Sequence, residues 1–187
     1  MRIIIGITGA SGSVYALKLI DVLRKQRCEV HAVVSNSGWE VLDYEMNITR
    51  EVLRQKVDVL HEVNNIGASI ASGSFKNDAM IVVPCSMKTL ACIANGISDN
   101  LLTRAADVTL KEGRSLIIVP RETPINAIHL ENMLKLAKLG VKILPACPAF
   151  YHKPDAIEDL VDMLVGKICD LISVEHDLFK RWEGNGR

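Results

Sequence analysis

Three continuous apolar runs constrain the fold of this chain more than any other feature of its sequence. Residues 3–5, 79–84 and 116–120 read III, AMIVVP and LIIVP, with many β-branched side chains and no polar alternation. A strand of this composition has to be covered on both faces, as in a parallel sheet that is flanked by helices. Because helical patterns separate the runs, the sequence predicts an α/β fold with a three-layer, doubly wound parallel sheet.

Helix and strand signals along the rest of the chain fit this plan. Further strands are expected at residues 29–35 and 141–144, and helices at residues 12–26, 38–45, 50–55, 90–94, 101–110, 126–139 and 155–174. Ser37, Thr49 and either Asp99 or Asn100 are expected to cap the helices that follow them. Residues 57–76 contain several Gly, Ser and Asn residues, which predict a short strand remnant and an ordered loop.

Composition narrows the class of protein. A chain of 187 residues with 49% hydrophobic content suffices for one domain, so a single domain over residues 1–187 is expected. Lys and Arg number 22, as do Asp and Glu, without a basic stripe, so nucleic acid is not an expected partner. The sequence has neither a signal-peptide pattern nor a membrane-spanning apolar run, so we expect a soluble, cytoplasmic protein without membrane contact. Zero net charge with a mean hydropathy of +0.20 favours burial of surface in an oligomer.

A glycine-rich turn follows the first apolar run. Gly6, Gly9 and Gly12 have the spacing G-x-x-G-x-x-G and lead into the first expected helix, whose free N–H groups predict a phosphate cradle. A dinucleotide site has the spacing G-x-G-x-x-G and an acidic residue after the second strand, whereas Ser35 stands there in this chain. The turn therefore favours a mononucleotide or a simple phosphate over NAD, with Ser11 and Ser35 as hydroxyl donors. A glycine-rich turn that binds nothing is the alternative.

Polar residues gather where the expected strands end. The loops at residues 9–12, 85–89, 121–124 and 149–151 all follow strands, so a parallel sheet brings them to one edge. This edge is expected to collect hydroxyls, cations and one carboxylate, from Ser11, Ser35, Ser86, Thr89, Tyr151, Lys88, Arg104, Lys111, Arg121 and Glu122. Such a set predicts an anion site with one candidate acid or base.

Other chemistries find less support in the sequence. The five cysteines show no C-x-x-C spacing, which predicts neither disulfides nor a zinc site, and the five histidines are scattered. Cys85 could act as a nucleophile at a helix start, but a buried thiol is the preferred interpretation. The G-x-S-x-G motif of serine hydrolases is absent from the sequence.

Seven short motifs carry a resemblance to a known family. They read ITGASG (7–12), ASGSF (71–75), VPCSMKTL (83–90), DNLLTRAADV (99–108), VPRETP (119–124), IHLENML (128–134) and PAFY (148–151). In this order, over essentially the whole chain, they resemble the UbiX-type flavin prenyltransferases, formerly described as aromatic acid or 3-octaprenyl-4-hydroxybenzoate decarboxylases. The resemblance implies a flavodoxin-like or Rossmann-like flavoprotein, usually a dodecamer built from trimers with active sites between subunits.

The resemblance also implies a reaction. Members of the family join the dimethylallyl group of dimethylallyl monophosphate to N5 and C6 of reduced FMN, which adds a fourth ring to the flavin, and no metal is required. The product, prenylated FMN, passes to a UbiD-type decarboxylase. The sequence leaves open whether the product serves ubiquinone biosynthesis or aromatic acid decarboxylation, and whether dimethylallyl pyrophosphate replaces the monophosphate.

Matching positions imply roles for individual residues. The FMN-binding positions are Gly9, Ala10, Ser11, Ser35, Ser86, Met87, Lys88, Thr89 and Arg121. Positions that hold or surround the prenyl phosphate are Tyr151, Lys167, Ser72, Arg104, Lys111 and Glu122. Glu45 matches a carboxylate that reaches the site from a neighbouring subunit, and Trp182 matches an aromatic residue near the site. The tail at residues 175–187 is expected to pack on a neighbouring subunit.

Catalytic roles are expected for Ser11, Glu45, Lys111 and Glu122. Fixed cations can stabilise the departing phosphate, aromatic faces can stabilise the prenyl cation, and Glu122 with Ser11 is expected to move the N5 proton. Lys167 stands where many relatives carry arginine, which exchanges a bidentate fork for a point charge. Gly113 replaces another common arginine and is expected to end a helix. A flavin-dependent decarboxylase and a non-catalytic FMN carrier are the alternative functions.

Overall fold

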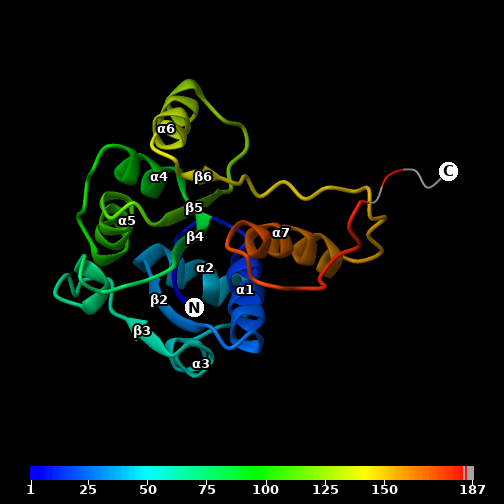
Figure 1. The fold of residues 1–187 in the computed structure, drawn as a ribbon, viewed down its shortest axis with the longest axis horizontal. Coiled ribbons are helices and arrows are strands. Elements are labelled where there is room, and N and C mark those ends of the chain that lie inside the picture. Colours follow the sequence, from blue (N-terminus) through cyan, green and yellow to red (C-terminus); the bar gives the residue numbers. More distant parts are fainter. Residues whose placement is uncertain (183, 185–187) are drawn as a thin grey trace.

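The computed structural model describes residues 1–182 and 184. Within them, six parallel strands form one sheet in the order β3-β2-β1-β4-β5-β6 (Figure 1). The strands are β1 (Arg2–Ile7), β2 (Glu29–Val34), β3 (Val59–His61), β4 (Ala79–Cys85), β5 (Ser115–Pro120) and β6 (Lys142–Ile143). The predicted doubly wound α/β fold is confirmed, and β1 and β4 are direct neighbours at its centre.

Helices cover both faces of the sheet. They are α1 (Ser13–Lys25), α2 (Asn36–Met46), α3 (Arg50–Lys56), α4 (Met87–Ala94), α5 (Leu101–Lys111), α6 (Ala127–Lys138) and α7 (Ile157–Leu171), with a 3-10 turn η1 (Ser69–Ala71). Ile3 and Ile5 pack with α1 and α7 on one face, and Ile4 packs with α4 and α5 on the other. This alternation explains the unbroken apolar run of β1, because both faces of the strand are buried.

The helix starts agree with the sequence analysis to within one or two residues except at α4, which begins at Met87 and not at Leu90, because Ser86 caps it directly after β4. The expected cap of α2 also differs. Thr49 and Asn100 cap α3 and α5, as expected. The cap of α2 is Ser35, whose Oγ accepts a hydrogen bond from Gly38 N at 3.0 Å, so the expectation that Ser37 caps this helix is wrong. The helix begins two residues earlier than expected, because β2 ends at Val34 and Ser35 takes the extended backbone of a cap directly after it.

An arm, which we define as residues 145–156 and 172–182, projects from the sheet. In Figure 1 the chain leaves β6, runs outward, and returns through α7. Beyond α7 the chain folds back on the same helix, since Phe179 and His176 lie over Gly166, and Arg181 bonds to Asp170 at 2.7 Å. The expected packing of the tail on a neighbouring subunit stays a prediction, and residues 183 and 185–187 lie outside the described part. Among the helices described, none has the length and apolar content of a membrane span.

Candidate active site

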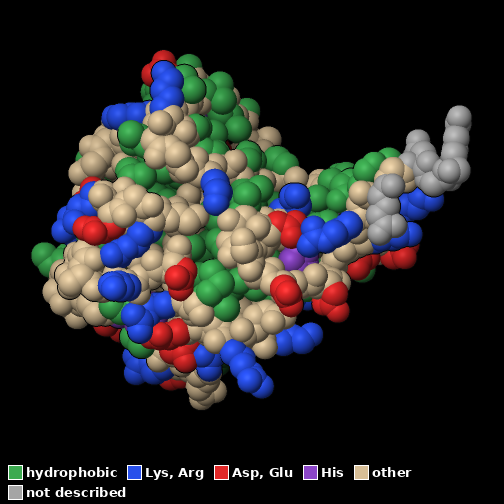
Figure 2. Space-filling view, viewed as in Figure 1, with side chains coloured by type: hydrophobic (Ala, Val, Ile, Leu, Met, Phe, Trp, Pro, Cys, Tyr) green, Lys and Arg blue, Asp and Glu red, His purple; other side chains and the backbone are tan. Residues whose placement is uncertain are grey.

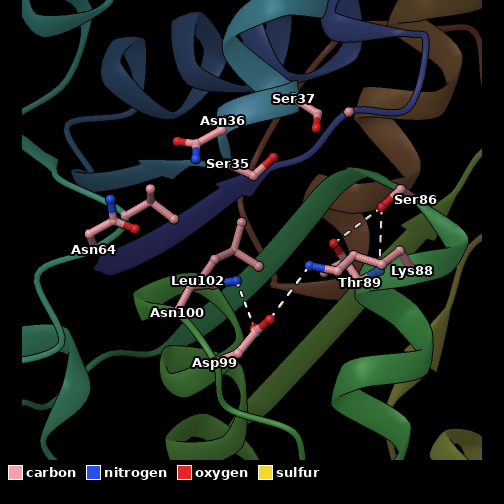
Figure 3. Close-up of a pocket in the computed structure, with 12 residues that line it drawn as sticks. Ser35, Asn36, Ser37, Asn64, Ser86, Lys88, Thr89, Asp99, Asn100 and Leu102 are labelled. Carbon is pink, nitrogen blue, oxygen red and sulfur yellow. Dashed lines mark hydrogen bonds and ion pairs between the residues drawn. The ribbon is translucent and has the colours of Figure 1, made fainter.

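A cleft of about 500 Å³ opens at the carboxyl edge of β1, β2 and β4 (Figure 3). Its lining residues are Gly9, Ser35, Asn36, Ser37, Val63, Asn64, Ser86, Lys88, Thr89, Asp99, Asn100 and Leu102. The volume is in the range of small-molecule and cofactor sites. Ligands of open α/β sheets bind at this edge, where strand order reverses between β1 and β4. The cleft is therefore the first candidate for a binding site.

Two helices begin at the cleft and make it attractive to an anion. Ser35 starts α2, and Ser86 starts α4, where its Oγ accepts from Thr89 N at 3.3 Å and donates to Thr89 Oγ1 at 3.1 Å. Figure 3 shows the start of α2 on one side of the cleft and Ser86, Lys88 and Thr89 on the other. Helix N-termini carry partial positive charge and unpaired N–H groups, and Lys88 adds a full charge.

Asp99 and Asn100 close the lower side of this cleft. Asp99 Oδ1 accepts from Asn100 Nδ2 at 2.9 Å, and Asp99 Oδ2 lies 3.5 Å from Lys88 Nζ (Figure 3). This ion pair is exposed, with 73% of the Lys88 side chain accessible, so it leaves the ammonium group free to turn toward a ligand.

The glycine-rich turn has a different role from the expected one. The N–H groups of Gly12 and Ser13, which open α1, donate to the Glu45 carboxylate at 3.0 and 2.9 Å. Burial alone would raise the pKa of the Glu45 carboxyl, but hydrogen bonds from Ser11, Ser13 and Gly12 outweigh it and lower the pKa. The expectation that the first N–H groups of α1 are free for a phosphate is therefore wrong within one chain, because Glu45 occupies those of Gly12 and Ser13, while a flavin site at residues 9–11 stays a prediction.

Glu45 itself corrects a second expectation. The carboxylate was expected to come from a neighbouring subunit, whereas α2 of the same chain brings it to the turn. The glycines serve close packing instead. A Cβ on Gly9 would lie 2.5 Å from Ser37 Cβ, so only glycine at this position lets the turn approach α2 this closely.

Arg121 and Glu122 lie at the end of β5, beside the glycine-rich turn. Arg121 Nε donates to Ser11 O at 3.1 Å, and Arg121 N donates to Cys85 O at 3.3 Å, so this residue connects three strand-end loops. The Glu122 side chain is exposed, and its Oε1 accepts from Thr123 N at 3.1 Å. Ser11, Arg121 and Glu122 are thus neighbours along one edge, as expected.

Four expected residues of this edge are buried, and one of them, Thr89, still lines the cleft. Ala10 and Met87 are 4% and 8% exposed, so the core holds their side chains and only their backbone groups can meet a cofactor. Cys85 is fully buried, and burial raises the pKa of its thiol far above the usual value. The interpretation of Cys85 as a buried thiol rather than a nucleophile is confirmed.

Ser72 and Lys111 lie away from the cleft, whereas Arg104 stands one turn into α5 and pairs with Asp107 at 2.7 Å. Helix α5 begins at the cleft, and Lys111 is its last residue, about 15 Å along the axis from the first. There Lys111 pairs with Glu112 beside Gly73, close to the start of β5. The expectation that Lys111 lies with Lys88 at one edge is wrong within a single chain, because α5 runs antiparallel to the strands.

Tyr151, Lys167 and Trp182 form a third group, on the arm and α7. The rings of Tyr151 and Trp182 meet edge to face with centroids 5.9 Å apart. Lys167 Nζ lies 3.8 Å from Asp170 Oδ2. One chain therefore separates the expected site residues into the cleft, α5 with Ser72, and the arm with α7.

The sequence analysis missed several residues of the cleft. They are Asn36, Ser37, Val63, Asn64 and Leu102 as lining, with Asp99 and Asn100 expected only as caps. Ser37 and Asn100 stand at helix starts, which is a signal that could have placed them at this edge. Val63 and Asn64 follow the short β3, and the irregular sequence around them carries no periodic signal.

Comparisons with known proteins agree with this geometry. The model of the family described as "Flavoprotein" matches residues 1–169. The chain is 50% identical to a flavin prenyltransferase UbiX of Halalkalibacterium halodurans, over 95% of this chain and 91% of that protein. A crystal structure of AnUbiX (PadA1) in complex with FMN and dimethylallyl pyrophosphate matches with a TM-score of 0.96 and 45% identity, covering 98% and 97% of the two chains. A dodecameric FMN-dependent UbiX-like decarboxylase from Escherichia coli O157:H7 matches with a TM-score of 0.96 and 43% identity, covering 98% and 100%.

Proposed function

The chain belongs to the flavoprotein family, and within it to the UbiX-type flavin prenyltransferases, and from this premise we propose its reaction in detail. The protein joins the dimethylallyl group of dimethylallyl monophosphate to N5 and C6 of reduced FMN. The observation that carries the proposal is the nearly full-length similarity to flavin prenyltransferases in a chain whose cleft is framed by two helix N-termini.

The cleft suits the FMN acceptor. Its volume of about 500 Å³ and its hydroxyl and N–H donors fit a mononucleotide. FMN does not require the acidic side chain at the end of β2 that binds the ribose of a dinucleotide. The phosphate of FMN would be held between the starts of α2 and α4, by Ser35, Ser86, Lys88 and Thr89. Gly9, Ala10, Ser11, Met87 and Arg121 would complete the flavin site, Ala10 and Met87 through backbone groups.

The prenyl phosphate needs groups that a single chain keeps apart. Tyr151 and Lys167, with Ser72, Arg104 and Lys111, offer the cations and hydroxyls of a phosphate site, and all of them lie outside the cleft of their own chain. We assign them to a site that neighbouring subunits complete, in a homo-oligomer such as a dodecamer. The E. coli relative is dodecameric, which supports this assembly.

The reaction breaks the allylic C–O bond of the donor. The bonding electron pair leaves with the phosphate, and N5 supplies the pair for the new C–N bond and loses its proton. The double bond of the transferred prenyl group then takes up a proton, and C6 supplies the pair for the new C–C bond and loses its own proton, so that ring closure changes no net count of protons. Lys111, Arg104 and Lys167 would stabilise the departing phosphate, and Tyr151 and Trp182 would face the prenyl carbon. Glu122, with Ser11, is assigned the N5 proton, and the released phosphate can accept the C6 proton.

Glu45 is assigned a supporting role in this chemistry. Its carboxylate bonds to the backbone of the turn that carries Ser11, and the Ser11 hydroxyl contributes to its lowered pKa. An ionised Glu45 would therefore fix the position of Ser11 beside the reacting flavin. The product, prenylated FMN, would pass to a UbiD-type decarboxylase.

One anaerobic experiment tests the proposal. Purified protein is mixed with reduced FMN and dimethylallyl monophosphate, and the flavin is followed by mass and absorbance. A flavin that gains one isoprenyl unit, with release of one inorganic phosphate, supports the proposal. Unchanged FMN bound to the protein would indicate a carrier, and release of CO₂ from an aromatic acid without a partner would indicate a decarboxylase.

A further inference from the structure

We infer that Thr8 is a positioning residue for flavin binding, because its buried hydroxyl ties the loop after β1 to the loop after β4. The inference rests on the proposed function in taking FMN as the occupant of the cleft. Thr8 stands between the apolar run of β1 and the glycine-rich turn, and it is 1% exposed.

Both hydrogen-bonding capacities of the Thr8 hydroxyl are used across the two loops. Thr8 Oγ1 donates to Pro84 O at 2.7 Å and accepts from Ser86 N at 2.8 Å. The backbone N–H of Thr8 also donates to Pro84 O, at 3.3 Å. Only a hydroxyl can donate and accept at one atom in this way, so apolar or purely donating side chains cannot replace it.

The tie lies where the backbone pairing of the sheet stops. The partners of β1 and β4 run from Ile3 and Ala79 to Gly6 and Val82, and the register of β4 becomes irregular between Val82 and Cys85. Beyond this point the two loops separate to form the cleft. The Thr8 hydroxyl therefore supplies the last contacts that hold them at a defined distance.

Thr8 acts on the cleft through Ser86. The N–H that Thr8 holds belongs to the residue that caps α4, and Lys88 and Thr89 lie in the first turn of that helix. Gly9, the next residue after Thr8, lines the opposite part of the same cleft. A shift of the Ser86 backbone would move the start of α4 relative to Gly9. The groups that hold the FMN phosphate would then lie at the wrong distance from the rest of the flavin site.

Substitution of Thr8 separates this role from a general effect on stability. Thr8→Val keeps the shape and removes the hydroxyl, whereas Thr8→Ser keeps the hydroxyl. Thr109→Val is the matched control, because Thr109 is also a fully buried threonine, and among the described residues its Oγ1 hydrogen-bonds only to Met80 Sδ, at 3.8 Å. Thermal unfolding of all three variants measures the general effect.

We expect FMN affinity, measured by quenching of flavin fluorescence, to fall by about tenfold or more in Thr8→Val. It should stay near the wild-type value in Thr8→Ser and in Thr109→Val. Prenyl transfer by Thr8→Val should recover largely at saturating FMN, so that KM for FMN changes more than kcat. Wild-type affinity in Thr8→Val, or an equal loss in Thr109→Val, would overturn the inference.

A measurement on the unaltered protein covers the case in which Thr8→Val does not fold. Hydrogen exchange of the Ser86 amide should be slow, as for the neighbouring strand amides, because Thr8 protects it. Fast exchange at Ser86 would contradict the tie. Binding of FMN without prenyl transfer by the wild-type protein would refute the proposed function and leave the inference on Thr8 intact.

Discussion

The cleft and the arm differ in how much of their surroundings one chain supplies. The strand-end loops around the cleft are held by hydrogen bonds within the same chain, such as those from Arg121 to Ser11 and from Thr8 to Pro84. The arm instead leaves large side chains in the open, since Phe150 and Trp182 are 68% and 62% exposed. In Figure 2 the arm projects from the main body, with hydrophobic and basic side chains on its surface. The difference supports the proposal that the flavin half of the site forms within a subunit and the prenyl-phosphate half forms between subunits.

Loss of Lys111 should impair the prenyl-phosphate half of the site and leave the flavin half unchanged. We expect Lys111→Ala to lower prenyl transfer roughly a hundredfold, because a cation opposite the leaving phosphate is removed. FMN affinity should stay unchanged, since Lys111 lies at the far end of α5 from the cleft. Lys25→Ala is the control, as Lys25 is an exposed lysine that also ends a helix. Equal loss of FMN binding in Lys111→Ala would contradict the division.

A change at Gly9 should impair the flavin half instead. Gly9→Ala puts a Cβ 2.5 Å from Ser37 Cβ, and the clash should cost about 1–3 kcal/mol of unfolding free energy and weaken FMN binding. Urea unfolding and flavin titration measure the two effects. Gly67→Ala is the control, because its Cβ would meet only an ordinary contact, with Asn65 Oδ1 at 3.5 Å, among the described residues. Normal stability in Gly9→Ala would show that α2 can move away from the turn.

Glu45→Gln should test the glycine-rich turn more gently, because it weakens the hydrogen bonds that hold the turn and keeps a side chain of the same size in place. We expect a loss of about 0.5–1.5 kcal/mol, since an amide oxygen accepts hydrogen bonds less strongly than a carboxylate. Because the folded state lowers the pKa of Glu45, its contribution is present above the usual carboxyl pKa and is lost as pH falls through the lowered value. The decrease in the free energy of unfolding toward acid pH should therefore be smaller in Glu45→Gln than in the wild-type protein. Glu40→Gln, an exposed change on the same helix, should leave that decrease as it is.

The edge of the sheet at β2 and β3 lies outside both the flavin half and the prenyl-phosphate half of the proposed site. A substitution there should have the smallest effect of those considered. His61 Nε2 lies 2.9 Å from His31 Nδ1, and burial together with the charge of His31 lowers the pKa of His61 to about 4. The unfolded chain therefore takes up a proton near the usual histidine pKa while the folded chain does not. Stability should fall modestly as pH decreases from about 6.5 toward 4, as measured by urea unfolding.

His61→Gln should reduce the difference in unfolding free energy between pH 7 and pH 5. Prenyl transfer at pH 7 should not change, because His61 lies outside both the cleft and the arm. A variant with the wild-type pH dependence would show that another group governs stability in this range.

The sequence predicted the fold and the family well, because both depend on local signals. The apolar runs specify buried strands, and the seven motifs lie in order along the chain, so the near full-length similarity to flavin prenyltransferases confirms the family. Five residues of the cleft were found for the same reason. Ser35, Ser86, Lys88 and Thr89 directly follow strands, and topology brings strand ends together.

The wrong expectations concern contacts between distant segments. No pattern around Gly12 indicates that Glu45, 33 residues later, takes the N–H groups of the turn. Likewise the spacing of Arg104 and Lys111 predicts a shared helix face, and it does not tell which end of α5 meets the cleft. The role of Thr8 was equally invisible, since its partners stand 76 and 78 residues away.

The sequence by itself thus determined which segments are strands and helices, that the sheet is parallel, and to which family the chain belongs. Hydrophobic periodicity and motif order suffice for this, because each is a property of neighbouring residues. Only the tertiary structure decided which donors remain free for a ligand. That choice depends on which distant groups satisfy each other first, as Glu45 does at α1, and so it left the starts of α2 and α4 to form the cleft.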